Sequence, residues 1–84
     1  MTEGFVYAVV GAGRQGTAAA YDMAVHGGAD KIVLADASAE VAARATDRIN
    51  HLVGRQVAES AQVDVRDYDA LVDLLIPVDV MLCA

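Results

Sequence analysis

Three glycines near the start of the chain have the spacing of a phosphate-binding turn. Gly11, Gly13 and Gly16 follow a run of strand-forming residues, FVYAVV, and give the pattern G-x-G-x-x-G. Between a strand and a helix, this pattern is typical of loops that hold the pyrophosphate of a dinucleotide. The first glycine permits a tight turn, the second leaves room for a phosphate, and the third lets the helix approach the strand. The N–H groups of the following helical turn, at the positive end of the helix dipole, would face the phosphates.

An acidic residue stands where such a fold would bind a ribose. Asp36 comes twenty residues after Gly16 and directly follows an apolar run, KIVLA. A carboxylate at this position accepts hydrogen bonds from the adenine ribose hydroxyls in dinucleotide-binding folds. The alternative is a turn or capping aspartate ahead of Ser38. We predict the ribose role because the strand, the glycines and the acid occur together.

Asp36 also bears on the choice between NAD and NADP. A 2′-phosphate beside its carboxylate would be repelled by roughly 1 to 4 kcal/mol at contact distance in a surface-like dielectric. No arginine follows at Ala37 or Ser38 to receive such a phosphate. We therefore predict NAD as the cofactor, with NADP less favoured.

Three further residues are predicted to lie at the cofactor. The backbone N–H of Gln15, with that of Arg14, is expected to point at the pyrophosphate. The Arg14 side chain either reaches a phosphate or stays solvated at the surface. Val65 follows a predicted strand close to where an adenine ring would lie, although a purely structural role fits this valine equally well.

Catalytic and metal-binding groups are not apparent in the sequence. The chain has two histidines and a single cysteine, Cys83, and these form no cluster that could hold a metal. We interpret Cys83 as a buried small residue, because no histidine is placed to activate its thiol. The sequence thus predicts a cofactor site without a catalytic residue.

The elements that must position these residues alternate between strand and helix. Strands are predicted at 5–10, 31–35, 61–65 and 78–84. One helix is predicted at 14–26, a second from an N-cap at Ser38 to a stop at Gly54, and a short third between Asp67 and Pro77. Two apolar helix faces are expected. The second helix should bury Val41, Ala45, Ile49 and Leu52, and the third should present one stripe of Tyr68, Leu71, Val72 and Leu75.

This alternation predicts an α/β fold with right-handed crossovers and a parallel sheet. The expected architecture is a Rossmann-type doubly wound sheet of strand order 3-2-1-4, with the cofactor at its carboxyl edge. Residues 1–84 would then be the N-terminal part of a dinucleotide-binding domain, namely one βαβαβ half plus a fourth strand. Because the chain stops within an apolar strand, we expect a longer polypeptide.

Composition excludes several classes of partner. A net charge of −6, without a basic stripe, argues against nucleic acid. The apolar runs are too short to span a membrane and no signal peptide opens the chain, so we expect a cytoplasmic protein. The open apolar edge of the fourth strand predicts self-association, and we expect a homo-oligomer.

The chain resembles the N-terminal region of the saccharopine dehydrogenase family, which includes the lysine 6-dehydrogenases. The similarity lies in VVGAGRQGTAAAYDMA, KIVLAD, DVRDYDALVDLL and VDVMLCA. This resemblance implies an oxidoreductase that passes hydride between an amino-acid substrate and a nicotinamide. It also implies that Gly11, Gly13, Gly16 and Asp36 bind the cofactor, and that the substrate-binding residues lie beyond Ala84. Both NAD and NADP are used within the family.

Two other functions remain open from the sequence. The same glycines and acid occur in non-catalytic nucleotide-sensing domains, such as those attached to ion transporters. A third possibility is a fragment that serves as a structural building block. Under the leading hypothesis, residues 1–84 contain the cofactor site but alone have no dehydrogenase activity, because they lack acid/base groups.

Overall fold

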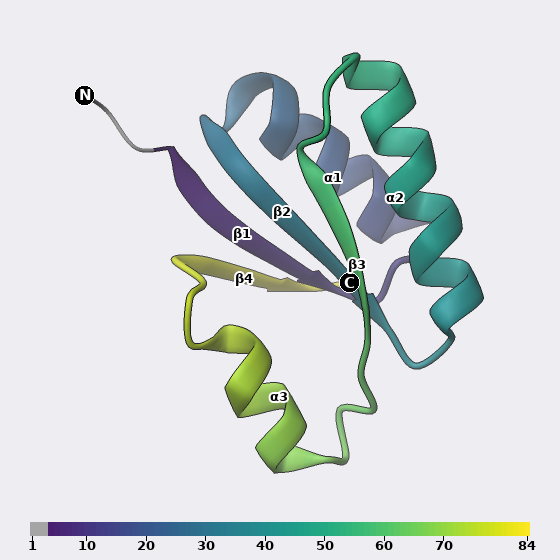
Figure 1. The fold of residues 1–84 in the computed structure, drawn as a ribbon, viewed down its shortest axis with the longest axis vertical. Coiled ribbons are helices and arrows are strands. Elements are labelled where there is room, and N and C mark those ends of the chain that lie inside the picture. The colour runs from purple at the N-terminus through teal and green to yellow at the C-terminus, as the bar shows by residue number, and fades with distance from the viewer. Residues whose placement is uncertain (1–3) are drawn as a thin grey trace.

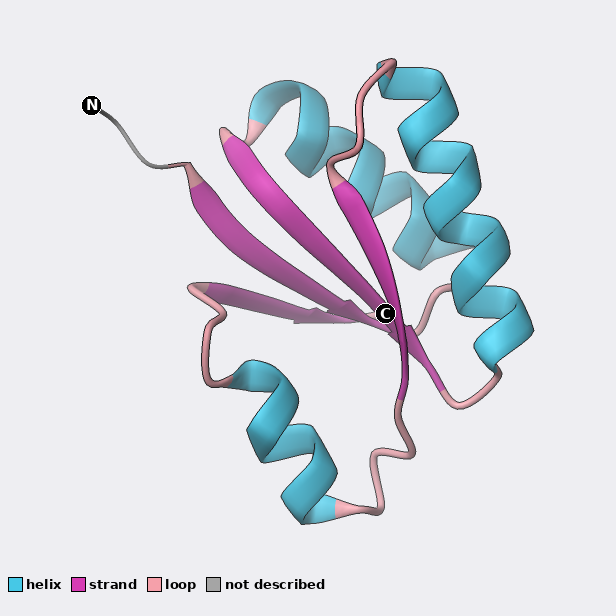
Figure 2. Cartoon of the chain, viewed as in Figure 1, coloured by secondary structure: helices cyan, strands magenta, loops and turns pink. Residues whose placement is uncertain are grey.

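The computed structural model describes residues 4–84, in which four strands and three helices alternate (Figures 1 and 2). The elements in chain order are β1 (Phe5–Val10), α1 (Arg14–His26), β2 (Ala29–Asp36), α2 (Ala39–Val53), β3 (Ala58–Gln62), α3 (Tyr68–Leu75) and β4 (Val80–Cys83). Within these residues, no helix is both long and apolar enough to cross a bilayer.

The strands form one parallel sheet in the order β3-β2-β1-β4, which confirms the predicted topology. Val10 pairs with Ala35 on one side and with Cys83 on the other, so three strands end at the same level. The loops that follow these ends therefore gather along one edge. This edge carries the glycine turn and Asp36.

The two faces of the sheet are covered unequally. Helices α1 and α2 lie side by side on one face, and α3 stands on the other (Figure 1). The largest fully buried side chains are aliphatic and lie in the core between the sheet and helices α1 and α2; they are Val9, Ile32, Leu34, Ile49 and Val57. Helix α3 contains no buried residue. The rigid core therefore supports the glycine turn from the α1 side.

Local capping groups define the helix ends, as the sequence predicts. Ser38 Oγ accepts a hydrogen bond from the Val41 N–H at 3.2 Å, and α2 ends at Gly54 in a left-handed conformation. An Asp67 oxygen accepts from the Ala70 N–H at the start of α3. Each cap satisfies a backbone group that the helix leaves unpaired.

The predicted third strand was three residues out of place. The prediction was 61–65, and the observed strand is Ala58–Gln62. Asn50 explains the shift, because its Oδ1 accepts from the N–H groups of Val57 and Ala58 at 2.9 and 2.8 Å. This side chain from α2 sets where the edge strand begins. Two other strands differ only at their ends, since β2 extends beyond 31–35 and β4 is shorter than 78–84.

Both predicted apolar helix faces need correction. In α2 the buried residues are Ala42, Ala45, Thr46 and Ile49. Small side chains let α2 approach the sheet closely, and Leu52 falls beside this stripe with 51% of its surface exposed. In α3 the single stripe divides: Leu71 and Leu75 are partly buried, whereas Tyr68 and Val72 are exposed.

Candidate functional site

Gly11 forms the turn that leaves β1. Its φ of +101° lies in the region that favours glycine, and an added Cβ would meet the Ala84 carbonyl oxygen at 2.5 Å. The Gly11 N–H donates to the Ala35 carbonyl at 2.7 Å and so extends the ladder with β2. A side chain here would be strained and would collide with Ala84, the residue that follows β4.

Gly16 brings α1 against this turn. A Cβ at Gly16 would overlap the carbonyl oxygen of Gly11 and would touch the Val9 side chain at 3.2 Å. The helix can therefore begin beside the strand end only if this position lacks a side chain. The backbone of the turn, and not a ligand, explains this glycine.

Gly13 has a different environment. A Cβ built on it would have no heavy atom within 4 Å, and its φ of −74° is open to any residue. The described protein itself therefore does not require glycine here. The position opens on a concavity of about 360 Å³, which we call the cradle. Its lining consists of Gly11, Gly13, Arg14, Gln15, Gly16, Asp36 and Ala84.

The start of α1 gives the cradle its polarity. Gly13 is the N-cap residue and provides no side-chain cap, and the first turn contains no acidic residue. The Thr17 N–H is bonded to the Gly13 carbonyl at 2.9 Å, so the N–H groups of the three residues before Thr17 lie ahead of the helical ladder. Free N–H groups and the positive dipole end favour an anion at this place.

Asp36 joins the two loops that border the cradle. Its Oδ2 accepts from the Ala12 N–H at 2.9 Å, and its Oδ1 accepts from the Ser38 N–H at 2.9 Å. These backbone donors, that of Ser38 first and that of Ala12 next, hold the pKa of the Asp36 carboxyl below its usual value. The carboxylate is therefore ionised at neutral pH. Because it has about four acceptor sites, it retains capacity for a ribose diol.

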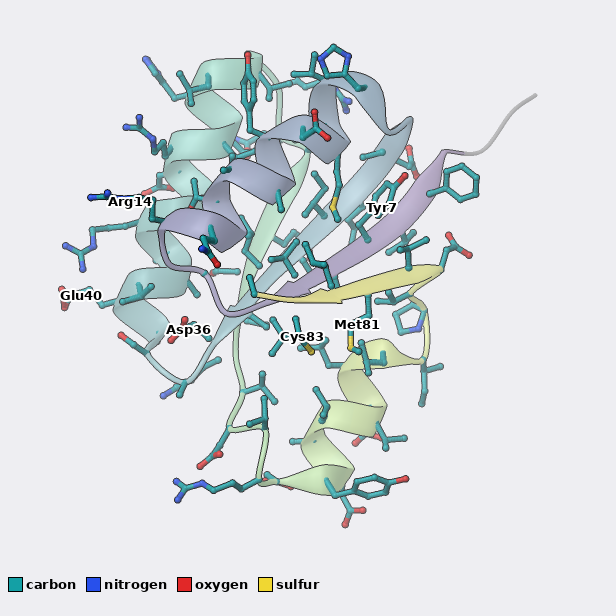
Figure 3. The ribbon with its side chains drawn as sticks, turned by 180° about the vertical axis from the view of Figure 1, so that it is seen from behind. Tyr7, Arg14, Asp36, Glu40, Met81 and Cys83 are labelled. Carbon is teal, nitrogen blue, oxygen red and sulfur yellow. The ribbon has the colours of Figure 1, made fainter. Side chains whose placement is uncertain are left out.

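A second hollow adjoins the cradle at the carboxyl edge of the sheet. It has a volume of about 520 Å³ and shares Gly11, Asp36 and Ala84 with the cradle. Val65 contributes to its wall and is 58% exposed. Met81 and Cys83 extend from β4 towards α3 on the same side (Figure 3). The hollow is mainly apolar and could receive a flat ring.

The comparisons with known proteins identify the domain. The model of the Saccharopine dehydrogenase NADP binding domain matches residues 7–83. The chain belongs to this family. Quinate dehydrogenase from Corynebacterium glutamicum, solved in complex with NAD, has a similar structure, with a TM-score of 0.79 and 30% sequence identity. The match covers 95% of this chain and 26% of that chain. No curated protein sequence was found to match.

The domain thus has a Rossmann-type NAD(P)-binding fold of a dehydrogenase family. Most residues predicted for its site lie together around the cradle. The remaining one, Val65, lies in the adjoining hollow.

Several features of this site escaped the sequence analysis. The Ala12 N–H is bonded to Asp36 across 24 positions, and no sequence signal marks this contact. Leu71, Leu75 and Met81 line the adjoining hollow. Their place could have been inferred from the sheet order, because β4 pairs with β1 and α3 is the helix that leads into β4.

Cys83 and Asp64 complete the wall of the hollow. Cys83 is exposed, which corrects the expectation of a buried thiol, because its side of β4 borders the open hollow between this strand and α3. The Arg66 guanidinium donates a hydrogen bond to Asp64 Oδ2 at 2.7 Å, and this interaction lowers the pKa of Asp64 to about 2. The hollow thus has one charged pair at its rim.

Proposed function

We propose that this domain binds NAD, and that the protein carrying it transfers hydride between an amino-acid substrate and the nicotinamide. The open environment of Gly13 supports the proposal most directly, because the protein leaves space there that a pyrophosphate would fill. The backbone N–H groups of Arg14 and Gln15 would bind the phosphates. Asp36 would accept the ribose hydroxyls, and Val65 would contact the adenine.

Three features support NAD over NADP, although the family description names NADP. The Asp36 carboxylate is ionised and would repel a 2′-phosphate. Glu40 adds a second acid in the first turn of α2. Arg44, one turn later, lies 3.7 Å from Glu40 and is paired with it. The β2–α2 turn therefore offers a 2′-phosphate more negative than positive charge.

The residues that line the cradle indicate which steps of the reaction this chain supports. A bound nicotinamide supplies the hydride acceptor, and this chain binds and orients the dinucleotide. The lining contains one carboxylate, Asp36, which is already engaged by two backbone N–H groups. We therefore place the proton-transfer and substrate-binding groups outside the described residues.

An assay of the complete protein tests this function. Saccharopine and lysine, each with NAD and with NADP, are compared by the absorbance of the reduced nicotinamide. We expect turnover with an amino acid and a higher kcat/KM with NAD. Binding of NAD without turnover of any amino acid would contradict the enzymatic proposal and would favour a nucleotide-sensing domain.

A hydroxy acid is the second candidate substrate. The structural similarity to a quinate dehydrogenase favours it. Quinate therefore belongs in the same assay, and turnover of quinate in place of amino acids would reverse the order of the two candidates. The match covers only 26% of that enzyme, so the similarity does not extend to the greater part of its chain.

The edge of β4 supports a further part of the proposal, association with another strand. β4 is the last strand of the described sheet, and its apolar residues Val80, Met81 and Leu82 are exposed. Exposed apolar strand edges pair readily with other chains. Sedimentation of residues 1–84 is expected to show self-association, and a stable monomer at high micromolar concentration would contradict it.

A further inference from the structure

The six cationic side chains of this acidic chain divide into two groups. Four have partners. Lys31 lies 3.4 Å from Glu59, Arg44 lies 3.7 Å from Glu40, Arg66 lies 2.7 Å from Asp64, and Arg55 donates to the Ala29 carbonyl at 3.2 Å. Among the described residues, Arg14 and Arg48 form no such ion pair or hydrogen bond. Both line the same groove between α1 and α2.

This α1–α2 groove lies outside the dinucleotide site and has a volume of about 520 Å³. Its other lining residues are mostly apolar and are Thr17, Ala18, Tyr21, Ile49 and Leu52. Tyr21 and Leu52 are 42% and 51% exposed, so apolar surface is available. The Thr17 hydroxyl is already bonded to the Gly13 carbonyl at 2.9 Å. The lining contains no acid, although acids outnumber bases twelve to six in the chain.

Such a surface matches one class of small molecule. An apolar body would cover the exposed Leu52 and Tyr21 side chains, and one negative group would be held by the guanidiniums. Arginine binds carboxylates through charge-assisted hydrogen bonds in a planar fork. The groove volume lies within the range of about 300 to 1,000 Å³ that is usual for small-ligand sites.

Arg14 connects this groove with the cofactor site. It is the first residue of α1, and its side chain extends from that helix start (Figure 3). It lines both the groove and the cradle. One guanidinium cannot hold a pyrophosphate and a carboxylate in two separate hollows with full strength. Occupation of either hollow would therefore weaken binding in the other.

We propose that the α1–α2 groove is a regulatory site for a free amphiphilic carboxylate, held by Arg14 and Arg48, that competes with the dinucleotide for Arg14. The carboxylate site itself stands independently of the proposed dehydrogenase activity. The competition rests on dinucleotide binding in the cradle.

Binding of decanoate, measured by calorimetry without nucleotide, tests the site. Arg48→Ala is expected to weaken binding by about tenfold or more, because a hydrogen bond to a charged group is lost. Leu52→Glu, at an exposed position, is expected to weaken it through like-charge repulsion. Arg44→Ala is the matched control, since Arg44 lies on the same helix, is paired with Glu40 and does not line the groove.

The outcomes separate the alternatives. Decanol, which lacks the charge, is expected to bind more weakly than decanoate. The proposal would be overturned if decanoate binding fell equally in all three variants, or if decanol bound as tightly as decanoate. It would also be overturned if the protein bound phosphatidylserine vesicles but not free decanoate. Circular dichroism of each variant confirms that the fold is retained.

The competition has its own test. Decanoate is expected to raise the Kd of NADH in the wild type several-fold and to have little effect in Arg48→Ala, which should bind NADH normally by itself. If decanoate binds at the groove but leaves the NADH Kd unchanged, the regulatory proposal is wrong. If NADH does not bind at all, the proposed function fails while the decanoate result stands.

Discussion

The Oδ2 atom of Asp36 accepts the Ala12 N–H at 2.9 Å and thereby joins the end of β2 to the glycine turn after β1. The Oδ1 atom of the same carboxylate holds the Ser38 N–H at the entrance to α2. The residue that is proposed to bind the ribose therefore also shapes the loops around it. Its two roles can be separated by experiment.

Removal of the Asp36 carboxylate is expected to destabilise the domain even without cofactor. Asp36→Ala leaves the Ala12 and Ser38 N–H groups without their acceptor and should cost about 1 kcal/mol or more in the free energy of unfolding. Urea unfolding measures this effect. Asp22→Ala is the control, because Asp22 is exposed on α1 and forms no side-chain bond to the described residues. Equal stability of both variants would show that the two bonds contribute nothing.

The same carboxylate predicts a pH dependence. Its folded pKa is lowered, so its contribution is fully present above the unfolded pKa of about 3.9 and is lost as the pH falls through the folded value. The stability difference between wild type and Asp36→Ala should therefore shrink below about pH 4. A difference that stays constant from neutral pH to acid would contradict this linkage.

Cofactor choice is expected to depend on Asp36. Asp36→Ala should weaken NAD binding by about ten- to a hundredfold, because a charge-assisted hydrogen bond is worth about 1.5 to 3 kcal/mol. The ratio of NAD to NADP affinity should fall as well, since the charge that repels a 2′-phosphate is gone. Adding Ala37→Arg should improve NADP binding further.

The affinity ratio is the decisive measurement for this prediction. If Asp36→Ala only loosened the glycine turn, the binding of NAD and of NADP would weaken alike. The ratio of the two affinities would then be unchanged. Dissociation constants for both cofactors in the complete protein therefore distinguish the ribose role from the loop role. An unchanged ratio would remove the basis for preferring NAD.

Gly13 and Gly16 are predicted to respond differently to the same substitution. Gly13→Ala should change stability by less than about 1 kcal/mol, because the position is open and its φ is ordinary, and the entropy gained is offset by the preference for glycine over alanine at an N-cap. It should nevertheless weaken NAD binding by filling the cradle. Gly16→Ala should destabilise the fold by about 1 to 3 kcal/mol through overlap with the Gly11 carbonyl. Thermal unfolding and NAD titration of both variants provide the comparison.

Asn50 is predicted to be a main structural residue outside the site. Its Oδ1 accepts from the N–H groups of Val57 and Ala58, and its Nδ2 donates to the Ala58 carbonyl. Asn50→Ala leaves these partly buried groups unpaired and should lower the free energy of unfolding by about 1 to 3 kcal/mol. Asp47→Ala, at an exposed position of the same helix whose side chain forms no hydrogen bond or ion pair with the described residues, is the control and should have a small effect. A similar loss in both variants would argue against the role of Asn50.

The sequence by itself determined those features that depend on neighbouring residues. Caps at Ser38, Asp67 and Gly54 act within one turn of the chain, so their residue types predict the helix ends. The glycine pattern likewise predicts the turn, and the position of Asp36 after an apolar run predicts an acid at the end of β2. The alternation of strands and helices predicts the sheet order, because parallel strands are connected by right-handed crossovers.

Only the tertiary structure decided features that arise between distant segments. The start of β3 depends on Asn50 from α2, and the exposure of Leu52 depends on how closely small residues bring α2 to the sheet. The second role of Asp36 depends on Ala12, which folding brings within 2.9 Å of a carboxylate 24 positions away. Such contacts have no periodicity or local motif, because the free energy that selects them comes from packing the whole chain.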